Sequence, residues 1–104
     1  MVFQIKEYLH HNYAVPSLSV PDISEHVHLS PAYVCTLFKS ETGQTLNQYL
    51  TDYRIKMSKQ FLSDPLYKIT DISAKVGYSD GNYYSKAFRK IVGLSPSEYR
   101  EKML

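Results

Sequence analysis

Polar and basic side chains gather on one predicted helical face near the C-terminal end of the chain. With helical spacing over residues 82–90, this face carries Asn82, Tyr83, Ser85, Lys86, Arg89 and Lys90. An asparagine can make two hydrogen bonds to adenine, a lysine can reach O6 and N7 of guanine, and hydroxyl groups can bond base edges or phosphates. A helix with such a face suits the major groove of double-stranded DNA.

A segment in the first half of the chain has a comparable face with smaller side chains. It consists of Ala32, Tyr33, Cys35, Thr36, Lys39 and Ser40. Ala32 and Thr36 could contact the methyl group of a thymine, whereas the thiol of Cys35 is only a weak hydrogen-bond donor. Few of these side chains could make a bidentate contact with a base.

The two segments are matching parts of an internal repeat. A shift of 49 positions aligns residues 22–30 with residues 71–79, and a shift of 50 aligns residues 33–49 with residues 83–99. The single inserted residue falls among turn-forming residues, where a change in length costs least. Each copy of the repeat is therefore a short element, a tight turn and a second element.

Apolar spacing and capping residues indicate that both elements of each copy are helices. A capping residue starts the second helix and a glycine ends it, Ser30 and Gly43 in the first copy and Asp80 and Gly93 in the second. Two short helices joined by a tight turn form a helix-turn-helix unit, whose second helix can enter the major groove.

The turn of the first copy has an unusual residue at one position. His28 stands where the second copy has Gly77. A glycine at such a turn often supplies a left-handed backbone conformation, which histidine tolerates better than most other residues. We expect the backbone at His28 to be slightly strained.

Between the copies lies the longest helical pattern of the chain. Thr45 and Gln48 form a capping box, and the segment Asp64-Pro65 ends the helix. A helix over residues 46–62 would be about 25 Å long. The apolar face predicted for it consists of Leu46, Tyr49, Leu50, Tyr53, Met57 and Phe61.

Two flanking helices complete an all-α fold of seven helices. Residues 2–13 have an apolar face with Phe3, Ile5, Tyr8 and Leu9, and the segment 95–98 caps a last helix that carries Tyr99 and Met103. Ile91 extends the apolar pattern of the preceding helix. We expect one helix-turn-helix subdomain in residues 1–44, a linker helix in 45–63 and a second subdomain in 64–104. With the linker as a spacer, one monomer could read two consecutive major grooves.

Charge is distributed unevenly along the chain, although the net charge is only +2. Residues 1–51 contain two basic and four acidic side chains, whereas residues 52–104 contain ten basic and six acidic ones. The cationic second half favours an anionic partner. No apolar run approaches the roughly 18 residues that a membrane span requires, and we expect a cytoplasmic protein without membrane contact.

The residues that could support a metal site or an enzyme are badly placed. The pairs His10-His11 and His26-x-His28 lack the spacing that aims two imidazoles at one metal, and Cys35 is the only cysteine. No glycine-rich phosphate loop follows a strand. We expect no metal, no cofactor and no enzymatic activity.

The most specific sequence motifs lie in the second half of the chain. They are D-I-S-A-K-V-G-Y-S-D at 71–80, Y-Y-S-K-A-F-R-K at 83–90 and G-L-S-P-S-E-Y-R at 93–100. Over residues 4–102 the chain resembles the DNA-binding domain of the AraC/XylS family of bacterial transcription regulators. Tyr78 and Tyr84 stand where that family more usually has phenylalanine.

The resemblance implies sequence-specific binding to a double-stranded DNA operator, usually for activation of transcription. Carried over by position, the residues that face the bases are Ala32, Cys35, Thr36, Asn82, Tyr83 and Lys86. We expect the second unit to discriminate more, because a bidentate contact contributes about 1–3 kcal/mol and the first unit has few candidates. Tyr83 could instead be a half-buried spacer.

Phosphate contacts are expected at the margins of the two faces. Lys39, Arg89 and Lys90 flank them, and Ser30 and Ser79 stand near helix starts, where backbone amides can also bind phosphate. Arg89 and Lys90 could also be ordinary solvated charges. For Arg54 we expect a pairing with an acid or with neighbouring carbonyls rather than with DNA.

The resemblance also implies partners beyond DNA. We expect the chain to be a fragment of a larger regulator with an upstream receiver or effector-binding domain, similar to the YesN-type two-component response regulators, and to act with RNA polymerase. The alternative is a helical protein-interaction module that does not bind DNA. Salt distinguishes the two, because DNA binding weakens steeply with salt whereas an apolar peptide groove is nearly insensitive.

Overall fold

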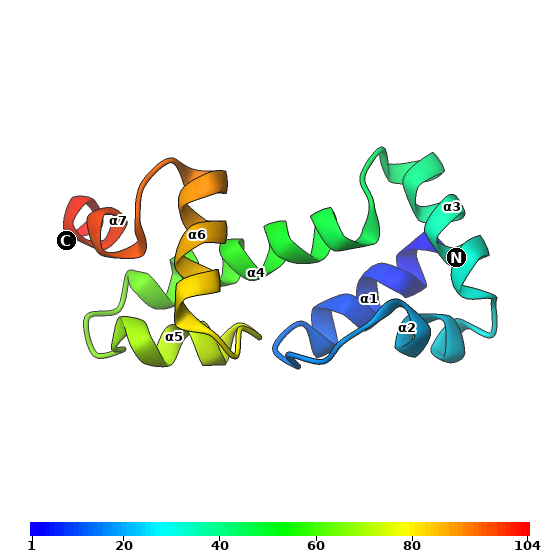
Figure 1. The fold of residues 1–104 in the computed structure, drawn as a ribbon, viewed down its shortest axis with the longest axis horizontal. Helices are drawn as coiled ribbons and strands as arrows, with labels where there is room; N and C mark the ends of the chain where they lie inside the picture. Colours follow the sequence, from blue (N-terminus) through cyan, green and yellow to red (C-terminus); the bar gives the residue numbers. More distant parts are fainter.

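The computed structural model describes all residues, Met1–Leu104, and contains seven α-helices and no strand. The all-α fold predicted from the sequence is therefore confirmed. In chain order the helices are α1 (Val2–Asn12), α2 (Val20–Val27), α3 (Pro31–Thr42), α4 (Leu46–Leu62), α5 (Ile69–Lys75), α6 (Gly81–Val92) and α7 (Pro96–Met103), as Figure 1 shows.

Helix α4 runs along the long axis of the molecule, which measures 43 × 22 × 21 Å (Figure 1). Its 17 residues correspond to a rod about 25 Å long. Helices α1–α3, the first unit, pack on its N-terminal half, and helices α5–α7, the second unit, pack on its C-terminal half. Helix α3 lies near the N-terminal end of α4 and α6 lies over its C-terminal half, and both run across the direction of α4.

The predicted helix starts are present with their capping hydrogen bonds. Thr45 Oγ1 accepts from the amide of Gln48 at 3.1 Å, and the amide of Thr45 donates to Gln48 Oε1 at 3.0 Å. Ser95 and Glu98 make the same pair of bonds at the start of α7, at 3.1 and 2.9 Å. These bonds satisfy amides that the first turn of a helix leaves unpaired.

The molecule has two apolar cores, one in each unit, and α4 contributes to both. The core of the first unit contains Ile5, Leu9, Ile23, Val34, Phe38, Leu46 and Leu50. The core of the second unit contains Ile55, Leu62, Ile72, Val76, Tyr78, Tyr84 and Phe88. Each core is small, and neither unit has a disulfide to support it, because Cys35 is free.

The apolar face predicted for α4 is only partly right in its second half, where Met57 and Phe61 pack at the edge of the second core. Tyr53, Met57 and Phe61 are only partly buried, whereas Ile55 and Leu62 are buried. The buried side of the helix changes because it serves two cores in turn. The step from Leu50 to Ile55 is five residues, which corresponds to about 140° around the helix axis.

Three other residues that the sequence places on apolar faces are exposed instead. Phe3 is 70% exposed, Ile91 43% and Met103 54%. Each follows the apolar spacing of its helix, but none belongs to either core or packs against one.

The backbone at His28 has the left-handed conformation expected from the repeat. His28 ends α2 with φ 58° and ψ 41°, and it is the only residue other than glycine with a positive φ. Gly77, its counterpart in the second unit, has φ 98°. A side chain in this conformation costs about 1–2 kcal/mol.

We expect His28→Gly to raise the free energy of unfolding by up to about 1 kcal/mol, because relief of backbone strain exceeds the extra entropy of the unfolded chain. Urea unfolding followed by circular dichroism measures it. The matched control is His26→Gly, within α2, which should lower stability because glycine is a poor helix former. A loss of stability in both variants would show that the turn is unstrained.

Two buried tyrosine hydroxyls have no hydrogen-bond partner. Tyr78 is 6% exposed and Tyr84 1%, and both oxygens are buried and unsatisfied. Burial raises the pKa of both side chains. The Ser58 hydroxyl lies close enough to Tyr84 to oppose this rise in pKa, but Ser58 donates its proton to the Ile55 carbonyl at 2.7 Å.

Removing the hydroxyl of Tyr84 should leave the protein at least as stable. We expect Tyr84→Phe to raise the free energy of unfolding by about 0–1 kcal/mol, because the variant no longer buries an unpaired hydroxyl. Thermal and urea unfolding measure this. A loss of more than about 1 kcal/mol would mean that the hydroxyl has a partner, such as a bound water.

Candidate nucleic-acid interface

Burial in α6 separates a core side from an exposed side that carries the expected polar residues. Tyr84 and Phe88 are buried in the second core, and the Asp80 carboxylate caps the helix by accepting from the amide of Asn82 at 2.9 Å. The exposed side consists of Asn82, Tyr83, Ser85, Lys86, Arg89 and Lys90. The whole candidate reading face of α6 is therefore open to solvent.

The side chain of Tyr83 is 64% exposed. Its ring centroid lies 5.8 Å from that of Tyr78, with the planes tilted by 40°. Tyr83 is therefore not a half-buried spacer. Most of its side chain is open to solvent despite the contact with Tyr78.

Helix α3 repeats this arrangement in the first unit. Val34 and Phe38, at the positions equivalent to Tyr84 and Phe88, are buried in the first core. The exposed side consists of Ala32, Tyr33, Cys35, Thr36, Lys39 and Ser40. The structure thus places all six candidate base-reading residues at the surface, three on each of two helices at opposite ends of α4.

The residues expected to contact phosphate are all exposed, but two of them already have protein partners. Arg89 Nη1 lies 3.5 Å from Glu98 Oε1, and Ser30 Oγ accepts from the amide of Tyr33 at 3.2 Å. Lys39 and Lys90 form no ion pair within the chain. Their ammonium groups are free to neutralise an external anion.

A groove of about 670 Å³ lies between the N-terminal half of α4 and the side of α6. Lys86 and Lys90 line one wall, and Asn47, Gln48 and Thr51 line the other. The sequence pattern gave Gln48 only a capping role and did not single out Asn47 or Thr51. Their spacing along the polar side of the helix is the signal that could have found them, since it directs them toward α6.

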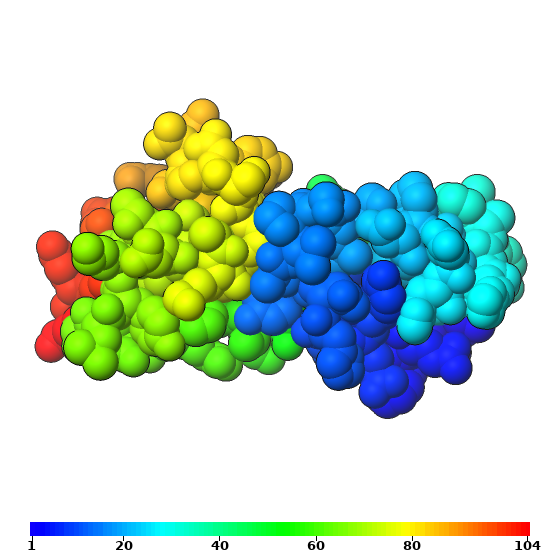
Figure 2. All heavy atoms as spheres, turned by 90° about the horizontal axis from the view of Figure 1, so that it is seen from below, coloured from blue at the N-terminus to red at the C-terminus, as the bar shows by residue number.

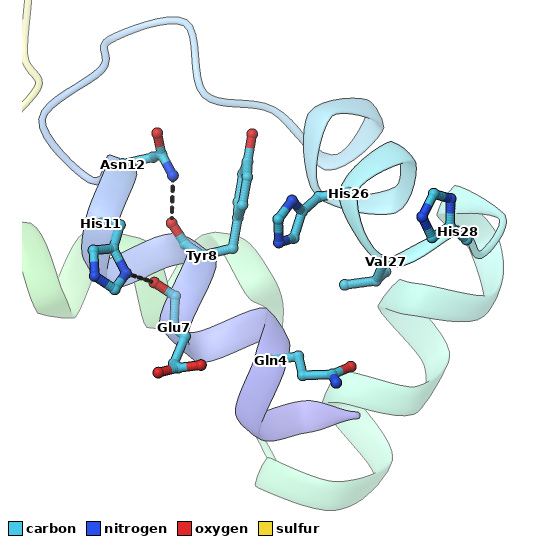
Figure 3. Close-up of a pocket in the computed structure, with 8 residues that line it drawn as sticks. All are labelled: Gln4, Glu7, Tyr8, His11, Asn12, His26, Val27 and His28. Atoms are coloured by element: carbon cyan, nitrogen blue, oxygen red, sulfur yellow. Dashed lines mark hydrogen bonds between the residues drawn. The ribbon is translucent and has the colours of Figure 1, made fainter.

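A second groove, of about 490 Å³, lies between α1 and α2 and contains three histidines (Figure 3). His26 lies against the ring of Tyr8, with centroids 4.4 Å apart, and His11 Nδ1 donates to the carbonyl of Glu7 at 2.8 Å. His28 lies farther along the groove. No group of three or more metal-ligating side chains gathers anywhere in the structure.

None of the seven helices is both long and apolar enough to cross a membrane.

Two helix-turn-helix units on one linker helix, each exposing the polar side of its second helix, define a DNA-binding domain of the double helix-turn-helix class. A family model described as a helix-turn-helix domain matches residues 23–102. The chain belongs to the AraC/XylS family of helix-turn-helix domains of transcription regulators.

Three known proteins illustrate the relationship. The Msm operon regulatory protein of Streptococcus mutans is 36% identical over 102 residues, which are 98% of this chain and 36% of that protein. The arabinose operon regulatory protein of Escherichia coli is 32% identical over 94 residues, which are 90% of this chain and 32% of that protein. The chain therefore spans about a third of the length of these relatives.

The third is a solved structure, the C-terminal domain of the two-component response regulator yesN from Fusobacterium nucleatum. It superposes with a TM-score of 0.88 at 28% sequence identity. The match covers 92% of this chain and 93% of that one. Both units and the linker helix are therefore shared with this domain.

The capping role of the Ser30 hydroxyl can be tested by measuring stability in the absence of DNA. We expect Ser30→Ala to lower the free energy of unfolding by about 1 kcal/mol, because the amide of Tyr33 loses its acceptor. Urea unfolding measures this. In the control Ser40→Ala, an exposed position on the same helix, stability should stay within about 0.5 kcal/mol of the unaltered chain. Equal effects of the two substitutions would argue against the cap.

Proposed function

We propose that this domain reads two consecutive major grooves of one DNA duplex, with α3 in one groove and α6 in the next. The observation that carries the proposal is the equivalent burial of the two helices. Val34 and Phe38 in α3, and Tyr84 and Phe88 in α6, face the cores and leave equivalent polar sides exposed. The 43 Å length of the molecule is sufficient to span the roughly 34 Å between successive major-groove faces.

In this proposal the bases are read by the exposed central residues of the two helices. In α6, Asn82 and Lys86 have the side chains that make bidentate contacts with adenine and guanine, and Tyr83 stands beside them. In α3, Ala32, Cys35 and Thr36 offer mainly apolar contacts. The second unit therefore supplies most of the sequence discrimination.

Phosphates are held at the margins of the same faces. Lys39 and Lys90 are exposed and make no ion pair, and Ser79 is also exposed. Ser30 keeps its hydroxyl proton for a phosphate while its oxygen caps α3. Arg89 reaches DNA by leaving Glu98, which costs little because an exposed ion pair contributes about 0–1 kcal/mol.

The role of the whole protein extends this proposal. A solved domain with the same arrangement of helices comes from a two-component response regulator, and the chain covers about a third of two curated relatives. We infer a cytoplasmic regulator in which an upstream receiver or effector-binding domain controls the DNA-binding units. When bound at an operator, it activates transcription through RNA polymerase.

The proposal is tested by selecting bound duplexes from a randomised DNA pool and following pool affinity at several salt concentrations. We expect two short half-motifs about one helical turn apart, and a logarithmic salt slope of about −0.9 per phosphate contacted. Selection of a single half-motif would mean that the first unit contacts only the DNA backbone and reads no bases. The absence of salt-dependent binding would reject the DNA proposal and favour the alternative, a helical module for protein partners.

Single substitutions test whether the second unit contributes more than the first to discrimination between DNA sequences. Lys86→Ala should weaken binding to the selected site by about 1–3 kcal/mol and relax the preference at one base pair, whereas Thr36→Ala should change the preferred sequence little. Lys102→Ala is the matched control, because it removes one exposed lysine from α7, which is neither of the two reading helices. An unchanged preference in Lys86→Ala together with an altered one in Thr36→Ala would reverse the ranking.

A further inference from the structure

The guanidinium of Arg54 lies where the loop after α1 meets the turn that precedes α6. Arg54 is 9% exposed, in the middle of α4. Its Nε donates to the carbonyl of Tyr13 at 2.8 Å, and its Nη2 donates to the carbonyl of Val15 at 2.9 Å. Both carbonyls belong to the loop that follows α1, so one side chain holds two points of that loop.

The same guanidinium also contacts the second unit. Its Cζ lies 5.4 Å from the centroid of the Tyr78 ring, within the range of a cation–π interaction. Tyr78 is buried in the second core and stands three residues before the start of α6 at Gly81. Arg54 therefore connects the loop of the first unit to the turn that leads into the recognition helix of the second.

Gly77 makes this contact sterically possible. A Cβ atom on Gly77 would collide with the carbonyl oxygen of Tyr13 and would lie 2.8 Å from Arg54 Nε. Only a residue without a side chain lets the turn of the second unit approach the loop of the first. Figure 1 shows the loop after α1 and the turn before α6 meeting at the centre of the molecule, and Figure 2 shows the blue and yellow atoms in contact there.

Arg54 has no carboxylate partner. The single ion pair of the structure joins two other residues, Arg89 and Glu98. Burial lowers the pKa of Arg54, but a guanidinium remains charged in proteins. The two carbonyls lie just past the end of α1, where the helix dipole also favours a cation. The loop is therefore the main partner of this buried charge, and a planar group with several donors is needed to hold both oxygens.

We propose that the Arg54 joint, formed by Arg54, Tyr13, Val15, Gly77 and Tyr78, fixes the orientation of α6 relative to α3 and thereby sets the half-site separation that the domain accepts. Without the joint, α4 alone would connect the units, and a single helix bends. With the joint, the units are attached at two places. Arg54 is thus a positioning residue that acts without touching DNA, and the inference about half-sites rests on the proposed function.

The orientation itself can be measured without DNA. Cys35 on α3 is the only cysteine, so Ser85→Cys on α6 gives a clean pair of sites for spin labels. We expect a narrow distance distribution in the labelled parent, and a clearly broader one after Arg54→Lys or Gly77→Ala. Lysine keeps the charge but cannot bridge two carbonyls. An unchanged width in both variants overturns the proposal.

A matched control distinguishes loss of the Arg54 joint from the backbone strain of placing alanine at a positive φ. Gly93 has φ 89°, similar to the 98° of Gly77, but a Cβ atom there would meet nothing within 4 Å. Gly93→Ala should therefore destabilise the chain through its backbone while leaving the distance distribution narrow. Circular dichroism establishes that each variant is folded before labelling. Broadening in Gly93→Ala equal to that in Gly77→Ala also overturns the proposal.

The consequence for DNA is tested with duplexes that carry the selected half-motifs at their preferred separation, at separations changed by one base pair, or singly. We expect Arg54→Lys to bind the preferred duplex about tenfold more weakly, because the second unit is no longer presented in register. Its affinity for a single half-motif should be unchanged, and its penalty for a shifted separation should shrink. A uniform loss on all duplexes overturns the positioning role. A parent chain that binds no DNA rejects the proposed function instead, and the label distances still decide whether the joint exists.

Discussion

The structure depends on one helix being shared by two small cores. Each core has seven buried apolar residues, and α4 supplies two of them to each. Units of about 50 residues bury a smaller fraction of their surface than larger domains and are only marginally stable alone without a disulfide or a metal. Because both units pack on α4, each unit helps to order the helix that the other needs. The shared helix also fixes where α3 and α6 lie.

Two arginines, the buried Arg54 and the partly buried Arg100, stabilise this arrangement in the same way. Arg54 holds the carbonyls of Tyr13 and Val15 beyond α1, and Arg100 holds those of Leu62 and Asp64 at the end of α4, at 3.0 and 3.2 Å. In each case Nε and one terminal nitrogen bind oxygens two residues apart. The guanidinium therefore binds the free carbonyls at a helix end that lacks a glycine cap. It also connects that end to a distant segment.

The sequence predicted the seven helices, and the capped starts of α3, α4, α6 and α7, because caps and apolar spacing are local signals. It also predicted the left-handed turn at His28 and the exposed polar sides of α3 and α6. The buried side of α4 was predicted only in part. It follows a four-residue spacing through Leu46, Leu50, Arg54, Ser58 and Leu62, and an apolar pattern leaves out the polar members Arg54 and Ser58. The contact between Gly77 and Tyr13 could not be predicted from local signals, because it joins segments more than sixty positions apart.

The scarcity of ion pairs has a consequence for how this domain responds to its ionic environment. The only pair, Arg89 with Glu98, lies at the surface with both side chains more than half exposed. Screening by salt therefore removes almost none of the folding free energy, which comes from apolar burial and capped helix ends. Dissolved ions act on the ligand-facing lysines and leave the scaffold intact, so the domain can release a polyanion at high ionic strength without unfolding.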